Sequence, residues 1–257
     1  MKEIIEVENL SFSYEDDYVL KDINLTINKG DFIAFIGPNG SGKSTLLKLL
    51  IGDLKASSGQ VKLLGKAIKN FKEWDKVGYI SQKVRDFNSS FPATVKEIIG
   101  AALYQEMGWF KILTKKLEQR IDKVLKLVDM FDYKYRKIGE LSGGQQQRVF
   151  IARTLISNPE IIFLDEPLVG VDAKSQDEFY KLLAKLNGEL GITIVMISHD
   201  IYVISDQANK IFCFGNNSIF VHQAEEFDYI NYLNQIKGDN KSLVPKHEHQ
   251  GVNSRCC

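Results

Sequence analysis

Three short segments of this chain consist almost entirely of apolar residues, and they limit most strongly what it can fold into. They are residues 32–36 (FIAFI), 161–164 (IIFL) and 192–197 (ITIVMI). A strand with one solvated face alternates polar and apolar residues, so strands without alternation are expected to be buried on both faces. Such strands occur in parallel sheets that helices cover on both sides. The sequence therefore predicts an α/β fold with a mostly parallel sheet.

The other predicted elements surround these three strands. Residues 22–27 alternate cleanly, and with residues 3–14 they predict an antiparallel β edge. Apolar residues recur every three or four positions over residues 117–128, which predicts an amphipathic helix. We expect residues 83 to about 158 to form a mostly helical insert. Further strands are expected at 60–65, 76–81 and 210–214, and helices at about 44–50, 94–104 and 174–190.

Charge and composition narrow the class of protein. The 257 residues contain 33 Lys plus Arg and 33 Asp plus Glu. No global field attracts nucleic acid or an anionic membrane, so partners must be recognised by local shape and charge. Three cysteines give no disulfide framework, and Cys213, in an apolar run, is expected in the core.

The chain shows neither a signal-peptide pattern nor an apolar run of the roughly 18–20 residues that cross a bilayer. We therefore expect a soluble, cytosolic protein. Residues 1–236 are expected to form the folded domain, and the polar residues 237–257 a disordered tail.

A glycine-rich loop follows the first apolar strand directly and precedes a predicted helix. Its pattern, G-x-x-x-x-G-K-[ST], is typical of loops that hold nucleotide phosphates. The glycines let successive N–H groups face a phosphate, Lys43 can reach the β- and γ-phosphates, and Ser44 can offer its hydroxyl to Mg²⁺. A simple glycine-rich turn is the alternative, but the strand–loop–helix context favours nucleotide binding. The loop comprises Gly37, Pro38, Asn39, Gly40, Ser41, Gly42, Lys43, Ser44 and Thr45.

Two carboxylates, Asp165 and Glu166, end the second apolar strand. Ligands bind at the carboxyl ends of strands in such sheets. Asp165 is expected to hold Mg²⁺ through water, and Glu166 to orient or deprotonate an attacking water. A charged strand end that faces solvent is the alternative, and the phosphate loop in the same chain argues against it.

Two further polar residues follow predicted strands in the same way. His199 comes after the third apolar strand, which we expect to neighbour the strand that ends in Asp165, so it could reach the γ-phosphate. Gln82 follows residues 76–81 and could touch Mg²⁺ or the water with its amide. A structural role is the alternative for each residue.

Residues 141–145 (LSGGQ) begin a predicted helix with two adjacent glycines. Ser142 and Gln145 have the spacing of a capping box, which makes the serine the N-cap. Gly143 and Gly144 then lie in the first turn, where bare N–H groups point outward and no side chain blocks approach. The segment predicts a second anion-binding helix end, although a well-capped helix alone would also explain it.

Together these motifs resemble those of the ATP-binding-cassette family. The phosphate loop, Gln82, LSGGQ, the IIFLDE strand, a loop with Asp172, and His199 occur in the family's order, and the resemblance covers roughly residues 3–214. Phosphate loops are shared by many nucleotide hydrolases, whereas LSGGQ shortly before the carboxylate strand is highly specific.

The resemblance implies an ATPase that works as a head-to-tail homodimer. ATP with Mg²⁺ would lie between the phosphate loop of one subunit and residues 142–145 of the other. Glu166 would be the catalytic base, His199 the γ-phosphate contact and Asp172 the link across the dimer. Gln82 would sense nucleotide and begin the helical insert that meets a membrane partner.

Tyr14 matches the family's adenine-stacking aromatic. A core aromatic that alternates with Phe12 is the alternative for Tyr14, and Tyr18 is a weaker candidate for the stacking role.

Among the family's branches, the chain is most similar to separate subunits that dock on a membrane permease of prokaryotic importers. It lacks the second cassette, coiled coils and zinc inserts of the soluble branches that act on nucleic acid or protein. The location implied is peripheral, at the cytoplasmic face of the cell membrane, with no nucleic-acid partner.

The cargo is suggested by two segments, residues 91–104 and 170–172, which look similar to the branch that imports zinc or manganese with an extracytoplasmic binding protein. Leu168 departs from the family's common Thr or Ser. Iron-chelate, cobalamin and efflux systems remain alternatives, as does a soluble ATPase. The tail holds four possible zinc ligands, although their spacing matches no standard site and a solvated tail is the alternative; they are His247, His249, Cys256 and Cys257.

Overall fold

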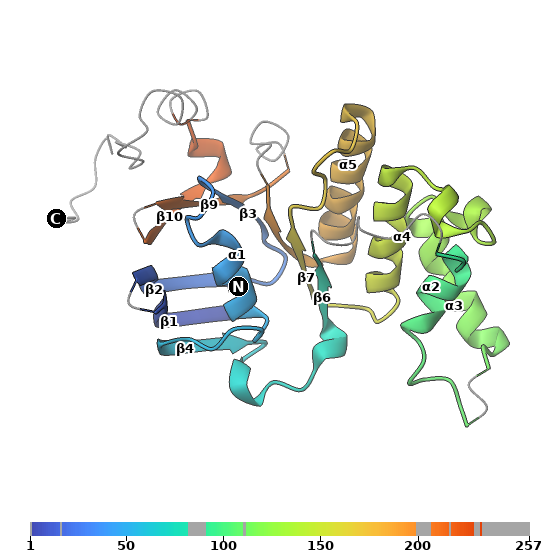
Figure 1. The fold of residues 1–257 in the computed structure, drawn as a ribbon, viewed down its shortest axis with the longest axis horizontal. Helices are drawn as coiled ribbons and strands as arrows, with labels where there is room; N and C mark the ends of the chain where they lie inside the picture. Colours follow the sequence, from blue (N-terminus) through green and yellow to red (C-terminus); the bar gives the residue numbers. More distant parts are fainter. Residues whose placement is uncertain are drawn as a thin grey trace.

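The computed structural model describes residues 2–15, 17–81, 91–109, 112–198, 207–215, 217–228 and 232. Its central element is a six-stranded sheet with the order β10-β9-β3-β8-β7-β6 (Figure 1). The strands from β9 to β6 are parallel, and only β10 runs antiparallel, beside β9. The predicted parallel sheet is therefore confirmed. Its strands are β3 (Phe32–Ile36), β6 (Val77–Ile80), β7 (Ile161–Asp165), β8 (Thr193–Ile197), β9 (Lys210–Gly215) and β10 (Ser218–Gln223).

The first strands of the chain form a second, antiparallel sheet with the order β2-β1-β4-β5. Ile23, Leu25 and Ile27 are buried while their neighbours along β2 are more exposed, as the alternation predicted. Its strands pair only with one another and do not extend the six-stranded sheet, although the two sheets share a buried cluster. Its strands are β1 (Glu3–Tyr14), β2 (Asp17–Asn28), β4 (Ser58–Leu63) and β5 (Lys66–Ala67).

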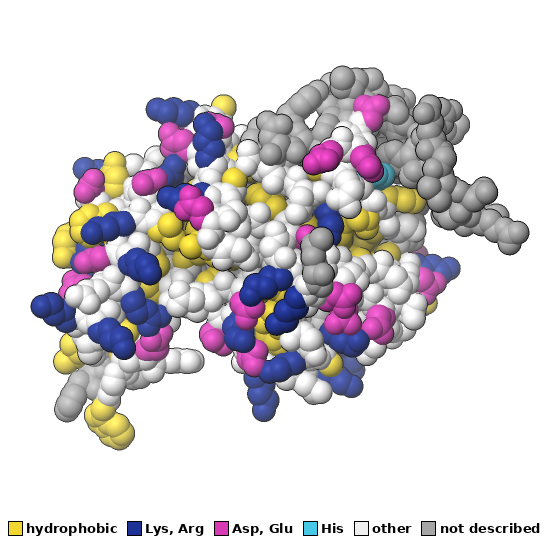
Figure 2. Space-filling model, turned by 180° about the vertical axis from the view of Figure 1, so that it is seen from behind, with side chains coloured by type: hydrophobic (Ala, Val, Ile, Leu, Met, Phe, Trp, Pro, Cys, Tyr) yellow, Lys and Arg dark blue, Asp and Glu magenta, His cyan; other side chains and the backbone are white. Residues whose placement is uncertain are grey.

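The chain between β6 and β7 forms the predicted helical insert, which contains α2 (Val95–Ala101), α3 (Lys115–Leu127) and α4 (Gly143–Leu155). Thr94 and Thr114 cap α2 and α3 by accepting hydrogen bonds from N–H groups in the first turn. α2 ends three residues earlier than predicted. The outer end of the insert carries projecting hydrophobic side chains, at the lower left in Figure 2.

Each face of the six-stranded sheet is covered by a different layer. Along β3, Phe32, Ala34 and Ile36 belong to one buried cluster, and Ile33 and Phe35 belong to the other. The first cluster is covered by α4 and by α5 (Ala173–Leu190), and the second by α1 (Lys43–Leu50) and the antiparallel sheet. Burying one aliphatic or aromatic side chain fully stabilises the fold by roughly 1.5–3 kcal/mol. Both covering layers therefore contribute to the stability of the sheet.

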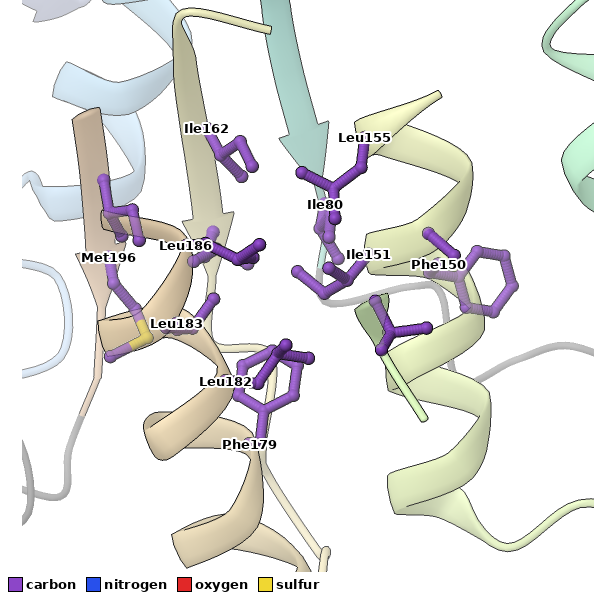
Figure 3. Packing of buried hydrophobic residues seen from close by; sticks show 14 of the residues in the cluster. Ile80, Phe150, Ile151, Leu155, Ile162, Phe179, Leu182, Leu183, Leu186 and Met196 are labelled. Carbon is purple, nitrogen blue, oxygen red and sulfur yellow. The ribbon is translucent and has the colours of Figure 1, made fainter. Parts of the chain in front are cut away.

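Figure 3 shows the first cluster from close by, where side chains of α4 and α5 meet those of three strands. The strand residues labelled are Ile80, Ile162 and Met196, those from α4 are Phe150, Ile151 and Leu155, and those from α5 are Phe179, Leu182, Leu183 and Leu186.

β10 was not predicted; half of its residues are exposed, half are partly buried, and their burial does not alternate. Cys213 is buried as predicted. None of the described helices is both long and apolar enough to cross a membrane. The short 3-10 segments are η1 (Ile68–Asn70), η2 (Trp74–Lys76), η4 (Phe131–Tyr133), η5 (Ile138–Glu140) and η6 (Ala224–Glu226).

The close approach of α4 to β6 depends on Gly78. A Cβ at this position would lie 2.2 Å from Thr154 Cγ2 and 3.1 Å from Ile162 Cγ1. We expect Gly78→Ala to lower the free energy of unfolding by about 1–3 kcal/mol through overpacking. Adding Thr154→Ser should recover part of this loss, because serine lacks the obstructing methyl group. Urea denaturation measures both changes.

Gly188→Ala is the matched control, because an added Cβ there meets no atom within 4 Å. It should leave stability unchanged or raise it by up to about 1 kcal/mol through helix propensity. Equal losses from both glycine substitutions would contradict the packing argument.

Candidate nucleotide-binding site

The phosphate loop and the two carboxylates lie at the same edge of the six-stranded sheet. β8 lies between β3 and β7, and Asp165, at the end of β7, pairs with Ile197 at the end of β8. This edge is the carboxyl end of the parallel strands, where ligands bind in open α/β sheets. The predicted neighbourhood of the second and third apolar strands is confirmed.

Two glycines allow the loop to turn sharply between β3 and α1. Gly37 and Gly42 have φ angles of +147° and +97°, a range that disfavours residues with a side chain. A Cβ on Gly37 would lie 2.7 Å from the carbonyl oxygen of Phe214, and one on Gly42 would lie 3.0 Å from Leu20 Cδ2. The loop backbone therefore fits between β9 and β2 only with glycine at both positions.

Lys43 folds back over the mouth of this loop. Its Nζ donates hydrogen bonds to the carbonyl oxygens of Gly37, at 2.8 Å, and Pro38, at 2.7 Å. Burial lowers the pKa of Lys43, against the opposing effect of the nearby carboxylates. Ser41 Oγ is buried and has no hydrogen-bond partner among the described residues. A buried cation beside an unpartnered hydroxyl fits the phosphates of a nucleotide.

The phosphate loop contains three further residues near Lys43 and Ser41 in the sequence. Asn39 and Gly40 form its exposed tip, and Thr45 lies in the first turn of α1.

Ser44 and Asp165 join the loop to the carboxylate strand. Ser44 Oγ donates a hydrogen bond to Asp165 Oδ1 at 3.2 Å. Burial raises the pKa of Asp165, while this hydrogen bond opposes the rise and the charge of Glu166 adds to it. Hydroxyl and carboxylate oxygens are the ligands that Mg²⁺ prefers. The pair therefore fits a magnesium ion, which when bound would neutralise phosphate charge.

Glu166 follows with a left-handed backbone. Its φ is +48°, which is uncommon for a residue with a long side chain, and its N–H donates to the carbonyl oxygen of Ile197 at 3.2 Å. Such a conformation costs roughly 1–3 kcal/mol and is often found at functional sites. Glu166 is therefore the first residue after β7, at the same edge of the sheet as Asp165.

The LSGGQ segment forms the capping box that the sequence predicted. Ser142 Oγ accepts a hydrogen bond from the Gln145 N–H at 3.3 Å, and Gln145 Oε1 accepts one from the Ser142 N–H at 3.0 Å. Ser142 is thus the N-cap of α4.

The two glycines of this segment have different roles. A Cβ on Gly143 would meet only Val171 Cγ2, at 3.9 Å, so this part of the helix end is open. A Cβ on Gly144 would lie 2.7 Å from Ser175 Cβ, because Gly144 is buried where α4 packs against α5. The expectation that both glycines leave the helix end open is therefore correct only for Gly143.

The loop between β7 and α5 lies beside this helix end. Asp172 caps α5, since its Oδ1 accepts a hydrogen bond from the Ser175 N–H at 3.0 Å. Hydrogen bonding by the Ser175 side chain, and next by this N–H, lowers the pKa of Asp172. Gln176 Nε2 donates to the carbonyl oxygens of Val171, at 2.9 Å, and Leu168, at 3.4 Å. Sequence analysis did not identify Gln176, although its position four residues after an N-cap aspartate places it one turn into the helix.

Sequence analysis also missed Arg148, which ties α4 to its neighbours. The guanidinium donates to Glu178 on α5 at 3.0 Å, and to Asp129 and the Val128 carbonyl oxygen after α3 at 3.3 and 3.2 Å. Nothing in the spacing of the charges along the chain identified these partners.

Tyr14 lies at the surface near the end of β1. Its side chain is 53% exposed, whereas that of Phe12, on the same face two residues earlier, is 7% exposed. Tyr14 is the last residue of β1 and is not a core aromatic. The two rings meet edge to face with centroids 4.9 Å apart. Tyr18, which pairs with Ser13 on the adjacent strand, is also exposed. Both tyrosine rings are thus accessible for stacking.

Several predicted residues lie outside the described part of the chain. They are Gln82, His199 and the tail residues His247, His249, Cys256 and Cys257. The chain before His199 is held in place, because Ser198 Oγ lies 3.3 Å from the Tyr180 hydroxyl of α5.

The fold and this edge of the sheet define a phosphate-loop nucleotide-binding protein. A model of the ABC transporter family matches residues 20–169. The chain belongs to this family, which confirms the resemblance seen in the motifs and the assignment as an ATPase.

The chain is also similar in sequence and structure to individual ATP-binding proteins of this kind. The chain is 48% identical over 229 residues to the zinc uptake system ATP-binding protein ZurA of Listeria monocytogenes, covering 89% of each chain. It is 38% identical over 240 residues to the manganese transport system ATP-binding protein MntB of Bacillus subtilis, covering 93% of this chain and 94% of that one. A dimeric ATP-binding cassette bound to ADP and phosphate superposes with a TM-score of 0.72 at 28% identity, covering 87% of this chain and all of that one.

The different environments of Gly143 and Gly144 predict different effects on stability. Gly144→Ala should lower the free energy of unfolding by about 1–3 kcal/mol, because the new methyl group meets Ser175. Gly143→Ala should change it by less than about 1 kcal/mol in either direction, since the site is open. Urea denaturation without nucleotide measures both.

Combining Gly144→Ala with Ser175→Gly removes the opposing Cβ. If the clash with Ser175 is the cause, the second substitution should cost less in the Gly144→Ala background than it does alone. Strictly additive effects would show that Gly144 serves another purpose.

Proposed function

We propose that this chain hydrolyses ATP to power the import of zinc or manganese through a membrane permease. The observation that carries the proposal is that one chain presents two separate anion-binding ends, the phosphate loop with Asp165 and the capped start of α4. The cargo assignment is supported by relatives whose names specify zinc uptake and manganese transport.

The two ends are proposed to complete each other in a homodimer. α1 and α4 cover opposite faces of the sheet (Figure 1), and no hydrogen bond or ion pair within the described residues joins the phosphate loop to residues 142–145. A second copy packed head to tail would bring its open Gly143 to the γ-phosphate. The dimeric state of the similar cassette with ADP and phosphate supports the proposal of a dimer.

The residue roles follow from chemistry and position. Lys43 binds the β- and γ-phosphates, and Ser44 with Asp165 would hold Mg²⁺. Glu166 accepts the proton of the attacking water. Tyr14 stacks on the adenine ring.

Three roles rest on the resemblance to the family. His199 would contact the γ-phosphate, Gln82 would sense the nucleotide, and Asp172 would reach across the dimer while it caps α5.

The proposed assembly is peripheral, at the cytoplasmic face of a prokaryotic cell membrane. Two copies of this chain dock on an integral permease, which receives its cargo from an extracytoplasmic substrate-binding protein. The proposed nucleotide-binding domain comprises residues 1–236, and the tail expected at 237–257 lies outside the described residues.

Glu166→Gln tests the catalytic assignment. The amide keeps the shape of the side chain but cannot accept a proton, so phosphate release should fall at least about a hundredfold. ATP binding should persist, and size-exclusion chromatography with ATP should show a trapped dimer.

Glu189→Gln, a like change at an exposed position on α5, serves as the control and should leave hydrolysis unaffected. Hydrolysis by Glu166→Gln at the wild-type rate would remove Glu166 from its role.

Metal uptake tests the cargo. Cells that lack the protein should lose zinc or manganese uptake while iron uptake is unchanged, because the proposed permease serves only the former ions. Wild type should restore uptake and Glu166→Gln should not, as isotope uptake assays would show. Unchanged uptake of every metal would refute the cargo and leave the ATPase assignment intact.

A further inference from the structure

The solvent-facing side of α3 carries a stripe of positive charge. At about 100° per residue, its five cations fall within an arc of about 140° that contains no carboxylate. Leu117, Ile121 and Leu125 are buried on the other side of the helix. The cations are Lys115, Lys116, Arg120, Lys123 and Lys126, and they are called the basic stripe below.

The carboxylates of α3 lie beside the stripe and are already neutralised. Asp122 forms an ion pair with Lys134 at 2.7 Å, and Glu118 pairs with Lys134 at 3.1 Å and also with Lys96. By contrast, Lys115, Lys116 and Lys123 form no ion pair with any other described residue. The stripe therefore presents uncompensated positive charge.

An exposed apolar loop adjoins the start of this helix. Trp109 is 94% exposed and Ile112 is 66% exposed. The described part of the loop is anchored, because Leu103 and Met107 are buried and Glu106 forms an ion pair with Arg120 of the stripe. Ile112 is only three residues from Lys115, so their Cα atoms are at most about 11 Å apart.

Both features work against the stability of the isolated chain. Lys115 and Lys116 occupy the first turn of α3, where the helix dipole disfavours cations. A nearly fully exposed indole leaves a large apolar surface in water. Both features are explained by an external surface that is apolar and negatively charged.

We propose that Trp109 and Ile112, together with the basic stripe, form a contact site for anionic phospholipid. Tryptophan is favoured at the membrane–water interface, and basic residues near an anionic leaflet add to the attraction. Hydrophobic side chains project at the end of the insert that carries α2 and α3, with Lys and Arg side chains on the adjoining surface (Figure 2). A projecting indole needs a receiving pocket on a protein partner but none on a bilayer, which favours lipid over an acidic protein segment.

This contact goes beyond the proposed ATPase function and depends neither on the cargo nor on hydrolysis. The lipid contact would attach the helical insert directly to the membrane, in addition to the attachment through the permease. Vesicles without permease and without ATP therefore test it independently of the proposed function.

Tryptophan fluorescence of the full chain provides the experiment. The sequence has two tryptophans, so Trp74→Phe leaves Trp109 as the only indole. Its emission should shift to the blue on vesicles of phosphatidylcholine and phosphatidylglycerol in equal parts, and should not shift on phosphatidylcholine alone. Lys116→Glu with Lys123→Glu should weaken vesicle binding at least about tenfold. Because a carboxylate in the first turn suits the helix dipole, the change at Lys116 should not unfold α3.

Lys69→Glu with Lys72→Glu changes the net charge equally, at exposed positions outside the insert, and should leave vesicle binding within about twofold. No blue shift on the anionic vesicles, an equal shift on phosphatidylcholine, or an equal loss in both double variants would overturn the proposal. A shift seen only with proteoliposomes that carry the permease would assign the surface to that protein and overturn it as well.

Discussion

Burial of the six-stranded sheet on both faces is the constraint from which the rest of the structure follows. Strands such as Phe32–Ile36 have no polar face, so each side of the sheet requires its own covering layer. Helices α4 and α5 supply one layer, and α1 with the antiparallel sheet supplies the other. With both faces covered, the carboxyl ends of the parallel strands are where polar side chains can meet a ligand, and the phosphate loop and Asp165 lie there.

The covering layer of α4 and α5 also connects the two anion-binding ends within one chain. The loop that follows Glu166 reaches Asp172, which caps α5, and α5 fits against α4 through Ser175 and Gly144. Arg148 reinforces the same junction with an ion pair to Glu178. These contacts form a continuous packed route from the carboxylate strand to the start of α4.

Much of the fold could be predicted because it rests on local patterns. The apolar runs, the alternation along β2 and the capping box around Ser142 each have a physical meaning within a few residues. β10 lacks such a pattern, since half of its residues are partly buried without alternation and its pairing with β9 sets its structure.

The site was predicted less completely than the fold. The residue types of the phosphate loop and Asp165 indicated their chemistry, whereas the role of Gly144 depends on Ser175, which is 31 residues away in the sequence and in contact only after folding. The partners of Arg148 escaped prediction for the same reason, because they come from different elements that tertiary packing brings together.

The resting position of Lys43 bears on the thermodynamics of nucleotide binding. Its ammonium group is already withdrawn from water and satisfied by the carbonyl oxygens of Gly37 and Pro38. In the proposed site, a phosphate would replace these two acceptors with its own oxygens and would not have to strip water from the lysine. The dehydration of this charge is thus part of the free energy of folding, and nucleotide binding as proposed would not incur it again.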